Sequence, residues 1–301
     1  MRKVWWLIFL FLLGFGFKKT EAIDNMGVYI SPPFIDMVMG ATDAQKDFVL
    51  ELGNNSPATI MVNLSVVDFG TLDESGGVAF LSSKENGDRK YALASWMSLE
   101  KDWVIIAPNK KEKIKITVLN KESLTSGGHY GAVLATVKSE AKLGKDMVGL
   151  NQSLASLIYI QKTGGEIKNL ILKNVELKSS WRQFVDKANI RFENNGNIHL
   201  VPRGKVEVKS SWGKLVAKGI INEASAKILP ESFRVFSLPI KTLNMWIWPG
   251  KYTAEISYRY DGKDNFVVFQ KQITYVGREG VIMITIVLLS IVFLWLWKRR
   301  V

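Results

Sequence analysis

The sequence IMVNLSVV at residues 60–67 places a branched apolar side chain at every second position, beginning with Ile60 and Val62. The sequence KIKITV at residues 113–118 repeats the pattern, with lysine or threonine between the apolar residues. Successive side chains of a β-strand point to opposite faces of the sheet, so a period of two predicts a strand with one buried face. Both stretches are therefore expected to be strands of this kind.

Further runs with the same period extend over most of the chain between its two ends. They occur at residues 27–31, 34–39, 47–52, 130–137, 154–160, 188–192, 205–209, 252–260 and 267–276. Gly, Pro and Asn separate these runs, and no convincing amphipathic helical pattern lies between them. Short strands divided by turn residues favour an all-β fold built from sandwiches over an α/β fold.

An internal repeat indicates two copies of one sandwich. The same landmarks recur in each half of the chain, namely an Asn-Asn turn and a stretch of 22 residues from a proline to a tyrosine. The first copy holds Asn54-Asn55 and the stretch from Pro108 to Tyr130, and the second holds Asn194-Asn195 and the stretch from Pro230 to Tyr252. Matching order and spacing predict a first domain at residues 23–162, a short flexible linker at 163–166 and a second domain at 167–277.

The C-terminal residues predict a membrane span. Seventeen almost wholly apolar residues, 281–297, lead directly into three cations. A helix rises about 1.5 Å per residue, so this run reaches roughly 25 Å, the short end of what crosses a bilayer core of about 30 Å. We expect a transmembrane helix at 280–297 and a cytoplasmic basic tail at 298–301. The anchoring residues are expected to be Val281, the interfacial Trp295 and Trp297, and the cations Lys298, Arg299 and Arg300.

The N-terminal residues 1–22 resemble a secretory signal peptide. Arg2 and Lys3 precede an apolar run, and Ala22 ends a stretch that suits cleavage. Lys18 and Lys19 follow the apolar run, which leaves an uncleaved N-terminal anchor as the alternative. In both cases the region between the two ends lies outside the cytoplasm, at a bacterial cell surface or in a periplasm.

The charge and cysteine content narrow the possible functions. The formal net charge is +12, but residues 1–22 and the basic tail each carry +3, which leaves +6 for the ectodomain. Export and dispersed cations argue against nucleic acid as a partner, whereas a mild positive bias suits an anionic wall polymer or a lipid surface. The chain has no cysteine, so disulfides, thiol catalysis and cysteine-ligated metals are excluded.

The first domain carries about eighteen extra residues, since 53 residues separate Asn55 from Pro108 and only 35 separate Asn195 from Pro230. The surplus is expected near residues 68–90, where Asp68, Asp73 and Glu74 offer carboxylate oxygens. These acids are a candidate ligand surface, and calcium binding or acid and base roles in glycoside hydrolysis are remote alternatives. The simplest alternative is a tolerated hairpin insertion.

Two tryptophans complete the candidate ligand surface. Trp246 and Trp248 alternate, so both indoles would lie on one side of a strand, where they could stack on sugars, contact the membrane interface or, as we favour, pack in the core. Tyr130 and Tyr252 each follow a glycine turn and are expected to be structural, as in the tyrosine corner of sandwich domains.

No catalytic motif accompanies these residues. His129 and His199 are the only histidines, and each is expected on the face of a strand, in different domains. The chain lacks a Gly-x-Ser-x-Gly elbow, a His-Glu-x-x-His pair and a phosphate-binding glycine loop. We therefore expect neither enzymatic activity nor a cofactor or metal site.

Several stretches resemble immunoglobulin-like domains of bacterial surface proteins, and the first domain also looks like the start of a fimbrial chaperone. They are ISPPFI at residues 30–35, FVLELGNN at 48–55, Ala107-Pro108 and GGHY at 127–130. The layout of a signal, two sandwiches, one C-terminal helix and a basic tail is similar to that of the WxL-interacting proteins of Gram-positive cell surfaces. This resemblance implies two tandem immunoglobulin-like domains, the first associated with peptidoglycan and the second with partner binding.

The favoured hypothesis is a non-enzymatic, membrane-anchored protein that binds cell-wall polymer or other surface proteins in an adhesion or scaffold role. The alternative is an assembly factor that lends or receives a strand at an exposed sheet edge, for which the apolar strand at residues 60–69 would be suitable. A glycoside hydrolase that uses carboxylates alone is the remote alternative.

Overall fold

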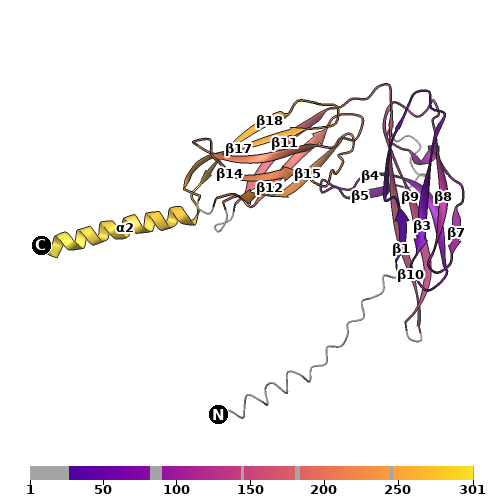
Figure 1. Ribbon diagram of the computed structural model, residues 1–301, viewed down its shortest axis with the longest axis horizontal. Helices are drawn as coiled ribbons and strands as arrows, with labels where there is room; N and C mark the ends of the chain where they lie inside the picture. Colours follow the sequence, from indigo (N-terminus) through magenta and orange to yellow (C-terminus); the bar gives the residue numbers. More distant parts are fainter. Residues whose placement is uncertain (1–26, 82–89, 144–145, 180–183, 245–246, 301) are drawn as a thin grey trace, which may run out of the picture.

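A computed structural model describes residues 27–81, 90–143, 146–179, 184–244 and 247–300. It contains two immunoglobulin-like β-sandwiches in tandem, followed by one apolar helix (Figure 1). The predicted all-β fold class is confirmed. The expected signal peptide at residues 1–22 lies outside the described residues.

The first sandwich packs two sheets against each other, with strand orders β1-β3-β8-β6 and β2-β10-β9-β4-β5, and β7 pairs with β4. Its strands are β1 (Val28–Ser31), β2 (Phe34–Met39), β3 (Gln45–Asn54), β4 (Ile60–Thr71), β5 (Val78–Leu81), β6 (Met97–Leu99), β7 (Trp103–Ile106), β8 (Lys110–Leu119), β9 (Gly127–Leu143) and β10 (Asp146–Lys162). A short 3-10 helix, η1 (Ala94–Trp96), precedes β6.

The period of two produces the core of the first sandwich. Val62 of β4 and Ile116 of β8 are fully buried between the sheets, whereas Met61, one position from Val62, is exposed on the outer face. Each fully buried branched side chain contributes roughly 1.5–3 kcal/mol relative to leaving it in water. The alternation in the sequence thus determines which face of each strand points inward.

The second sandwich packs a sheet of order β11-β12-β15 against one of order β16-β14-β13-β17-β18. Its strands are β11 (Leu170–Lys178), β12 (Lys187–Asn194), β13 (Arg203–Ser210), β14 (Leu215–Ile221), β15 (Ser232–Pro239), β16 (Lys241–Thr242), β17 (Gly250–Arg259) and β18 (Val267–Tyr275). Phe192 lies at the centre of its core, where its ring centroid is 4.9 Å from that of Tyr258 and 6.0 Å from that of Phe236.

The first asparagine of each Asn-Asn pair has the same structural role. Asn54 is buried at the end of β3, and its Nδ2 donates to the carbonyls of Ala58 at 2.8 Å and Ile106 at 2.9 Å. Its Oδ1 accepts a hydrogen bond from the backbone N–H of Ser56. The side chain therefore holds a turn closed against a neighbouring chain segment.

Asn194 repeats this arrangement at the end of β12. Its Nδ2 donates to the carbonyls of Ile198 at 2.7 Å and Ile228 at 3.0 Å, and its Oδ1 accepts from the N–H of Gly196. The residues that follow the two prolines also match, since Asn109 has a φ of 55° and Glu231 a φ of 54°. The predicted repeat thus corresponds to equivalent turns in the two sandwiches.

The segment between the sandwiches is held by hydrogen bonds on both sides. Ser126 Oγ of the first sandwich donates to the carbonyl of Thr163 at 3.3 Å, and Asn197 Nδ2 of the second donates to the carbonyl of Gly165 at 2.8 Å. The backbone N–H of Ile167 in turn donates to Asn197 Oδ1 at 2.6 Å. These bonds restrain the linker that the sequence predicts to be flexible, while the exact domain boundaries remain a prediction.

Helix α2 (Gly277–Arg300) is longer than the expected span at residues 280–297. Residues 280–299 have a mean hydropathy of 2.6 and are long and apolar enough to cross a membrane, since twenty residues of helix extend about 30 Å. The anchoring residues Val281, Trp295 and Trp297 are exposed on its surface. Lys298 and Arg300 lie in its last turn, and the Arg299 guanidinium lies 3.7 Å from the centroid of the Trp295 ring.

Candidate functional site

The long strand β10 has a partner on only one of its two edges over most of its length. β9 pairs with it from Asp146 to Lys162, but β2 pairs with its other edge only from Leu157 to Lys162. Among the described residues, no strand covers this second edge at positions 146–156. We call this segment the free edge of β10. At about 3.3 Å per residue, its eleven residues extend roughly 35 Å.

The start of β2 explains where the free edge ends. The chain leaves β1 in one sheet, passes through Pro32 and Pro33, and enters β2 in the other sheet. The N–H of Leu157 donates to the carbonyl of Pro33 at 3.0 Å, and Ser156 Oγ donates to that of Pro32 at 2.7 Å. These two bonds are the last connections between β10 and the segment that leads into β2.

The hydrogen bond of Leu157 also shows which backbone groups of the free edge are available. Backbone groups of alternate residues in a strand point to the same side, and the N–H of Leu157 points toward β2. The N–H and C=O groups of residues 147, 149, 151, 153 and 155 therefore point away from β9. They form a row of hydrogen-bonding groups that a further strand could use.

The strand that the sequence suggested for such an edge lies elsewhere in the sheet, so this prediction is wrong. β4, which contains residues 60–69, pairs with β9 on one side. On its other side it pairs with β7 over residues 60–63 and with β5 over residues 68–71. Apolar alternation indicates burial of one face and cannot distinguish a central strand from an edge strand.

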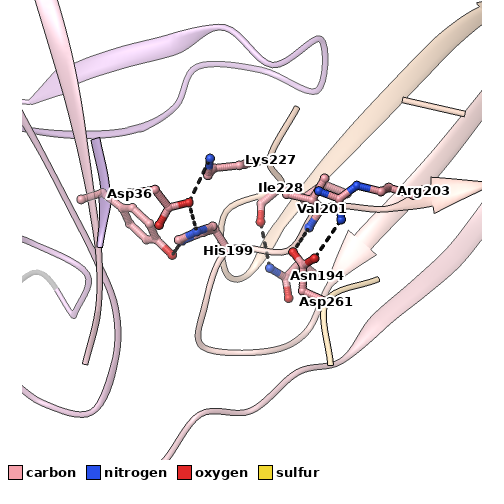
Figure 2. Close-up of polar contacts among 9 residues, drawn as sticks. Asp36, Asn194, His199, Val201, Arg203, Lys227, Ile228 and Asp261 are labelled. Atoms are coloured by element: carbon pink, nitrogen blue, oxygen red, sulfur yellow. Dashed lines mark hydrogen bonds and ion pairs between the residues drawn. The ribbon is translucent and has the colours of Figure 1, made fainter. Parts of the chain in front are cut away.

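A polar cluster joins the two sandwiches beside β2, and Figure 2 shows its geometry. Asp36 Oδ2 of β2 lies 3.2 Å from Nε2 of His199 and 3.1 Å from Nζ of Lys227, both in the second sandwich. Burial raises the pKa of the Asp36 carboxyl, but its hydrogen bonds to His199 and Lys227 and the positive charge of Lys227 lower it by more, so the pKa lies below its ordinary value. The cluster therefore favours an ionised Asp36.

Aromatic rings surround this cluster. The ring centroid of His199 lies 5.3 Å from that of Tyr159 and 5.8 Å from that of Tyr130, whose hydroxyl is 3.5 Å from His199 Nδ1. His199 lies in the loop after β12, not on a strand face as predicted. Tyr252 donates to the carbonyl of Trp248 four residues earlier, as in a tyrosine corner, whereas Tyr130 instead packs at the interdomain junction.

His129 has a different role from His199. It is buried in β9, with Nδ1 3.0 Å from the carbonyl of Ala92 and Nε2 2.8 Å from that of Thr125. Burial lowers its pKa, although these hydrogen bonds act in the opposite direction. Both ring nitrogens are engaged by backbone, so His129 is a structural residue and does not meet His199.

The turn between β4 and β5 makes a second interdomain contact. Arg191 of β12 donates two hydrogen bonds to the Glu74 carboxylate, from Nε at 2.7 Å and Nη2 at 2.6 Å. The N–H of Val235 donates to the carbonyl of the same Glu74 at 2.7 Å. The hydrogen bonds from Arg191 lower the pKa of Glu74. The extra residues of the first domain thus attach it to the second.

A third contact lies at the end of this insertion. The Glu231 carboxylate accepts hydrogen bonds from Lys90 Nζ at 2.5 Å and from the Tyr91 hydroxyl at 2.8 Å. The bonds from Lys90 and Tyr91 lower the pKa of Glu231. Glu231 belongs to the second sandwich and the other two residues to the first, so three carboxylates, Asp36, Glu74 and Glu231, hold the junction together.

The predicted acidic ligand residues do not converge on one site. Asp68 is buried, and its Oδ1 accepts from the N–H groups of Leu93 at 2.8 Å and Ala94 at 2.7 Å, at the start of η1. Asp73 accepts from the N–H of Ser75 within its own turn. In the part of the chain that the structure describes, no group of three or more His, Cys, Asp or Glu side chains could hold a metal ion. A ligand-binding role for these acids stays a prediction.

The tryptophan pair is only partly described. Trp246 lies outside the described residues. Trp248 is 65% exposed, contrary to the expected core packing, and Ile247 beside it is buried instead. Trp248 lies beside the start of β17, which pairs with the end of β18, whereas Glu74 contacts Arg191 of β12 and Val235 of β15, so the two lie at different parts of the second sandwich.

Sequence reasoning missed most of the junction residues. Asp36 and Lys227 are single charges within otherwise ordinary β patterns, and Arg191 occupies one position of a half-buried strand. Glu74 lies 117 residues from Arg191 in the chain, and His199 lies 163 residues from Asp36. Lys227 also contacts Asp36 from the other sandwich. No local spacing could reveal these contacts.

The fold is similar to that of several solved pilus chaperones. The class 5 fimbriae chaperone CfaA shows 14% identity and a TM-score of 0.45, covering 81% of this chain and 99% of that one. The SafA pilin complex with the SafB chaperone from Salmonella enterica gives 11% identity, a TM-score of 0.40, and coverage of 84% and 99%. No protein-family model and no curated protein sequence matches the chain. The sequence resemblance to WxL-interacting proteins is therefore not supported by a match to any family model or curated protein.

Proposed function

We propose that this chain is a membrane-tethered assembly factor that holds an extended segment of a secreted partner polypeptide along the free edge of β10. The partner segment would add a strand to the sheet β2-β10-β9-β4-β5 next to β2. Binding of this kind takes its affinity from main-chain hydrogen bonds, which the outward-facing groups of residues 147–155 can supply.

The length of the free edge is the observation that carries the proposal. Exposed sheet edges promote aggregation, and proteins commonly shorten them, cover them or interrupt them with proline or bulges. In the first sandwich, the edge at residues 146–156 is regularly paired with β9 in a continuous register and carries no proline. Such a segment is suited to receive a strand.

The rest of the structure supports holding rather than catalysis. The three carboxylate contacts fix the two sandwiches to each other, and α2 can tether them to a membrane. Binding to cell-wall polymer, which the sequence favoured, gains no supporting observation. Asp68 and Glu74, the acids invoked for it, are already engaged by backbone N–H groups and by Arg191, respectively.

The test uses a proline at one outward-facing position of the free edge. Ser153→Pro removes an N–H that points away from β9, so the β9–β10 pairing should persist while an added strand loses a hydrogen bond and close approach. Since one such bond contributes about 0.5–1.5 kcal/mol, its loss alone should weaken partner binding by roughly two- to tenfold. Ser153→Ala, which keeps the N–H, is the matched control.

Binding would be measured by co-expressing the full chain with each secreted protein encoded beside it. Hydrogen exchange of the complex should show protection of the amides at residues 147, 149, 151, 153 and 155. A partner that binds the wild-type chain and Ser153→Pro equally, and that protects none of these amides, would refute the proposal.

A further inference from the structure

Among the residues that the structure describes, the second sandwich carries two exposed indoles in neighbouring loops at one of its ends. Trp212 is 93% exposed and Trp248 is 65% exposed. Lys214 and Lys251 are also exposed and lie two and three residues from these tryptophans. We call Trp212, Lys214, Trp248 and Lys251 the collar of the second sandwich.

Strand pairing places the collar beside the start of α2. Tyr275, two residues before the helix, pairs with Gly250, which follows Trp248 by two residues. Ser210 pairs with Tyr252, and Ser211 Oγ donates to the carbonyl of Lys251 at 2.9 Å. The Trp212 hairpin is thus joined to the start of β17, and the start of β17 pairs with the end of β18, which leads into the helix.

The helix itself contacts one of these loops. A Cβ added to Gly280 would lie 2.9 Å from Cγ of Pro249, the residue after Trp248. Gly277 turns the chain from β18 into the helix with a φ of 53°. Figure 1 shows α2 leaving the end of the second sandwich that faces away from the first. The collar therefore lies where the apolar part of the helix begins.

The hairpin that carries Trp212 is well ordered by its own hydrogen bonds. The N–H of Gly213 donates to the carbonyl of Ser210 at 2.9 Å, and the N–H of Ser210 donates to the carbonyl of Lys214 at 2.9 Å. Gly213 has a φ of 78°, which closes the turn. A tight turn thus presents an almost fully exposed indole at the surface of the second sandwich.

The chemistry of the collar matches a membrane interface. Indole rings are amphipathic and concentrate at the headgroup level, and lysines close to a membrane interact favourably with anionic phosphates. The two loops, residues 210–215 and 247–251, contain both lysines and no acidic residue. A membrane is also the surface that α2 would bring to this position.

We propose that the collar is a lipid-binding surface that rests in the headgroup layer of the membrane crossed by α2, with anionic phospholipid as its ligand. Trp212 and Trp248 lie among the headgroups, and Lys214 and Lys251 interact with their phosphates. This inference rests on the membrane tether in the proposed function. It adds that the second sandwich is docked on the lipid and does not hang freely from the helix.

Site-specific fluorescence can test the docking, because the chain has no native cysteine. Single cysteines replace Ser211 beside the collar, Asp264 in the turn between β17 and β18 at the other end, and Leu288 within the helix. Each full-length variant is labelled with an environment-sensitive dye in vesicles of phosphatidylcholine and phosphatidylglycerol. Lipids with brominated chains or headgroup-level spin labels then quench dyes that contact the bilayer.

We expect quenching at positions 211 and 288 and little at 264. The added substitutions Trp212→Ala and Trp248→Ala should reduce quenching at 211 to the level of 264. Trp103→Ala removes an exposed tryptophan of the first sandwich, 54% exposed, and is the matched control that should change nothing. Vesicles without phosphatidylglycerol should weaken quenching at 211 but not at 288.

The outcomes separate this inference from the tether. If the dye at position 288 is quenched and the dye at position 211 is quenched no more than the dye at position 264, the docking is overturned and the membrane tether remains. Lack of quenching at all three positions would overturn both. Quenching at 211 that persists after both tryptophans are replaced would show that the collar residues do not bind the lipid, and would also overturn the inference.

Discussion

At the scale of single residues, two buried asparagines hold the same turn in both sandwiches. The sequence shows Asn54-Asn55 and Asn194-Asn195 as a repeat, yet only the first member of each pair is buried. The side-chain amide of Asn194 donates to two carbonyls and accepts from one N–H. A charged side chain at this buried position would pay a desolvation cost that the neutral amide avoids. The repeat therefore records a hydrogen-bonding requirement.

Replacement of Asn194 tests this role. Asn194→Ala leaves the carbonyls of Ile198 and Ile228 and the N–H of Gly196 without their partner, and each buried unsatisfied group costs about 1–3 kcal/mol. We expect the free energy of unfolding of the second sandwich to fall by about 3 kcal/mol, measured by native-state hydrogen exchange. Asn195→Ala, at the exposed neighbouring position, should change it by less than about 0.5 kcal/mol. Equal effects would contradict the assignment.

At the scale of elements, the sequence located the strands but underestimated their length. The runs at residues 130–137 and 154–160 became strands of 17 residues each, β9 and β10. The added parts include residues 139–143 of β9 and 146–147 of β10, where charged residues interrupt the apolar alternation. The two strands remain paired as far as Leu143 and Asp146. The pattern of one strand does not show which strand it pairs with or how far.

The insertion between β4 and β5 allows a prediction at the same scale. Glu74→Ala removes both hydrogen bonds from Arg191, so the two sandwiches should sample a wider range of relative orientations. Distances between spin labels on cysteines placed in each sandwich of the full chain would measure this range. Asp73→Ala is the matched control, since Asp73 bonds only within its own turn. A distance distribution that does not broaden in Glu74→Ala would contradict an anchoring role.

At the scale of the whole molecule, the collar and the free edge lie at opposite ends. The long axes of the two sandwiches cross rather than align, and α2 extends from the sandwich that does not carry β10 (Figure 1). A second sandwich docked on lipid would then hold the free edge of β10 away from the membrane. To hold the free edge at a constant distance from the membrane, the two sandwiches must keep a fixed relative orientation. A flexible linker would allow the first sandwich to contact the lipid or to change its distance from it.

The junction carboxylates make this fixed geometry dependent on pH. The pKa values of Asp36, Glu74 and Glu231 all lie below their ordinary range because cationic partners from the other sandwich hydrogen-bond to them. An acid with a lowered pKa contributes stability above the pKa of the separated group, about 4, and loses that contribution as the pH falls through the lower pKa of the joined state. The sandwiches should therefore stay joined from pH 8 to pH 5 and begin to loosen as the pH falls below about 4.

The same spin-label pair measures this change, with the full chain held in detergent at each pH. We expect one narrow distance distribution down to pH 5, progressive broadening as the pH is lowered below about 4, and return to the narrow form on neutralisation. Combining Asp36→Asn, Glu74→Gln and Glu231→Gln should give the broad distribution already at neutral pH, since the amides cannot form the ion pairs with Lys227, Arg191 and Lys90. Loosening between pH 8 and pH 6 in the wild-type chain would contradict this account, because none of the three carboxylates changes charge there.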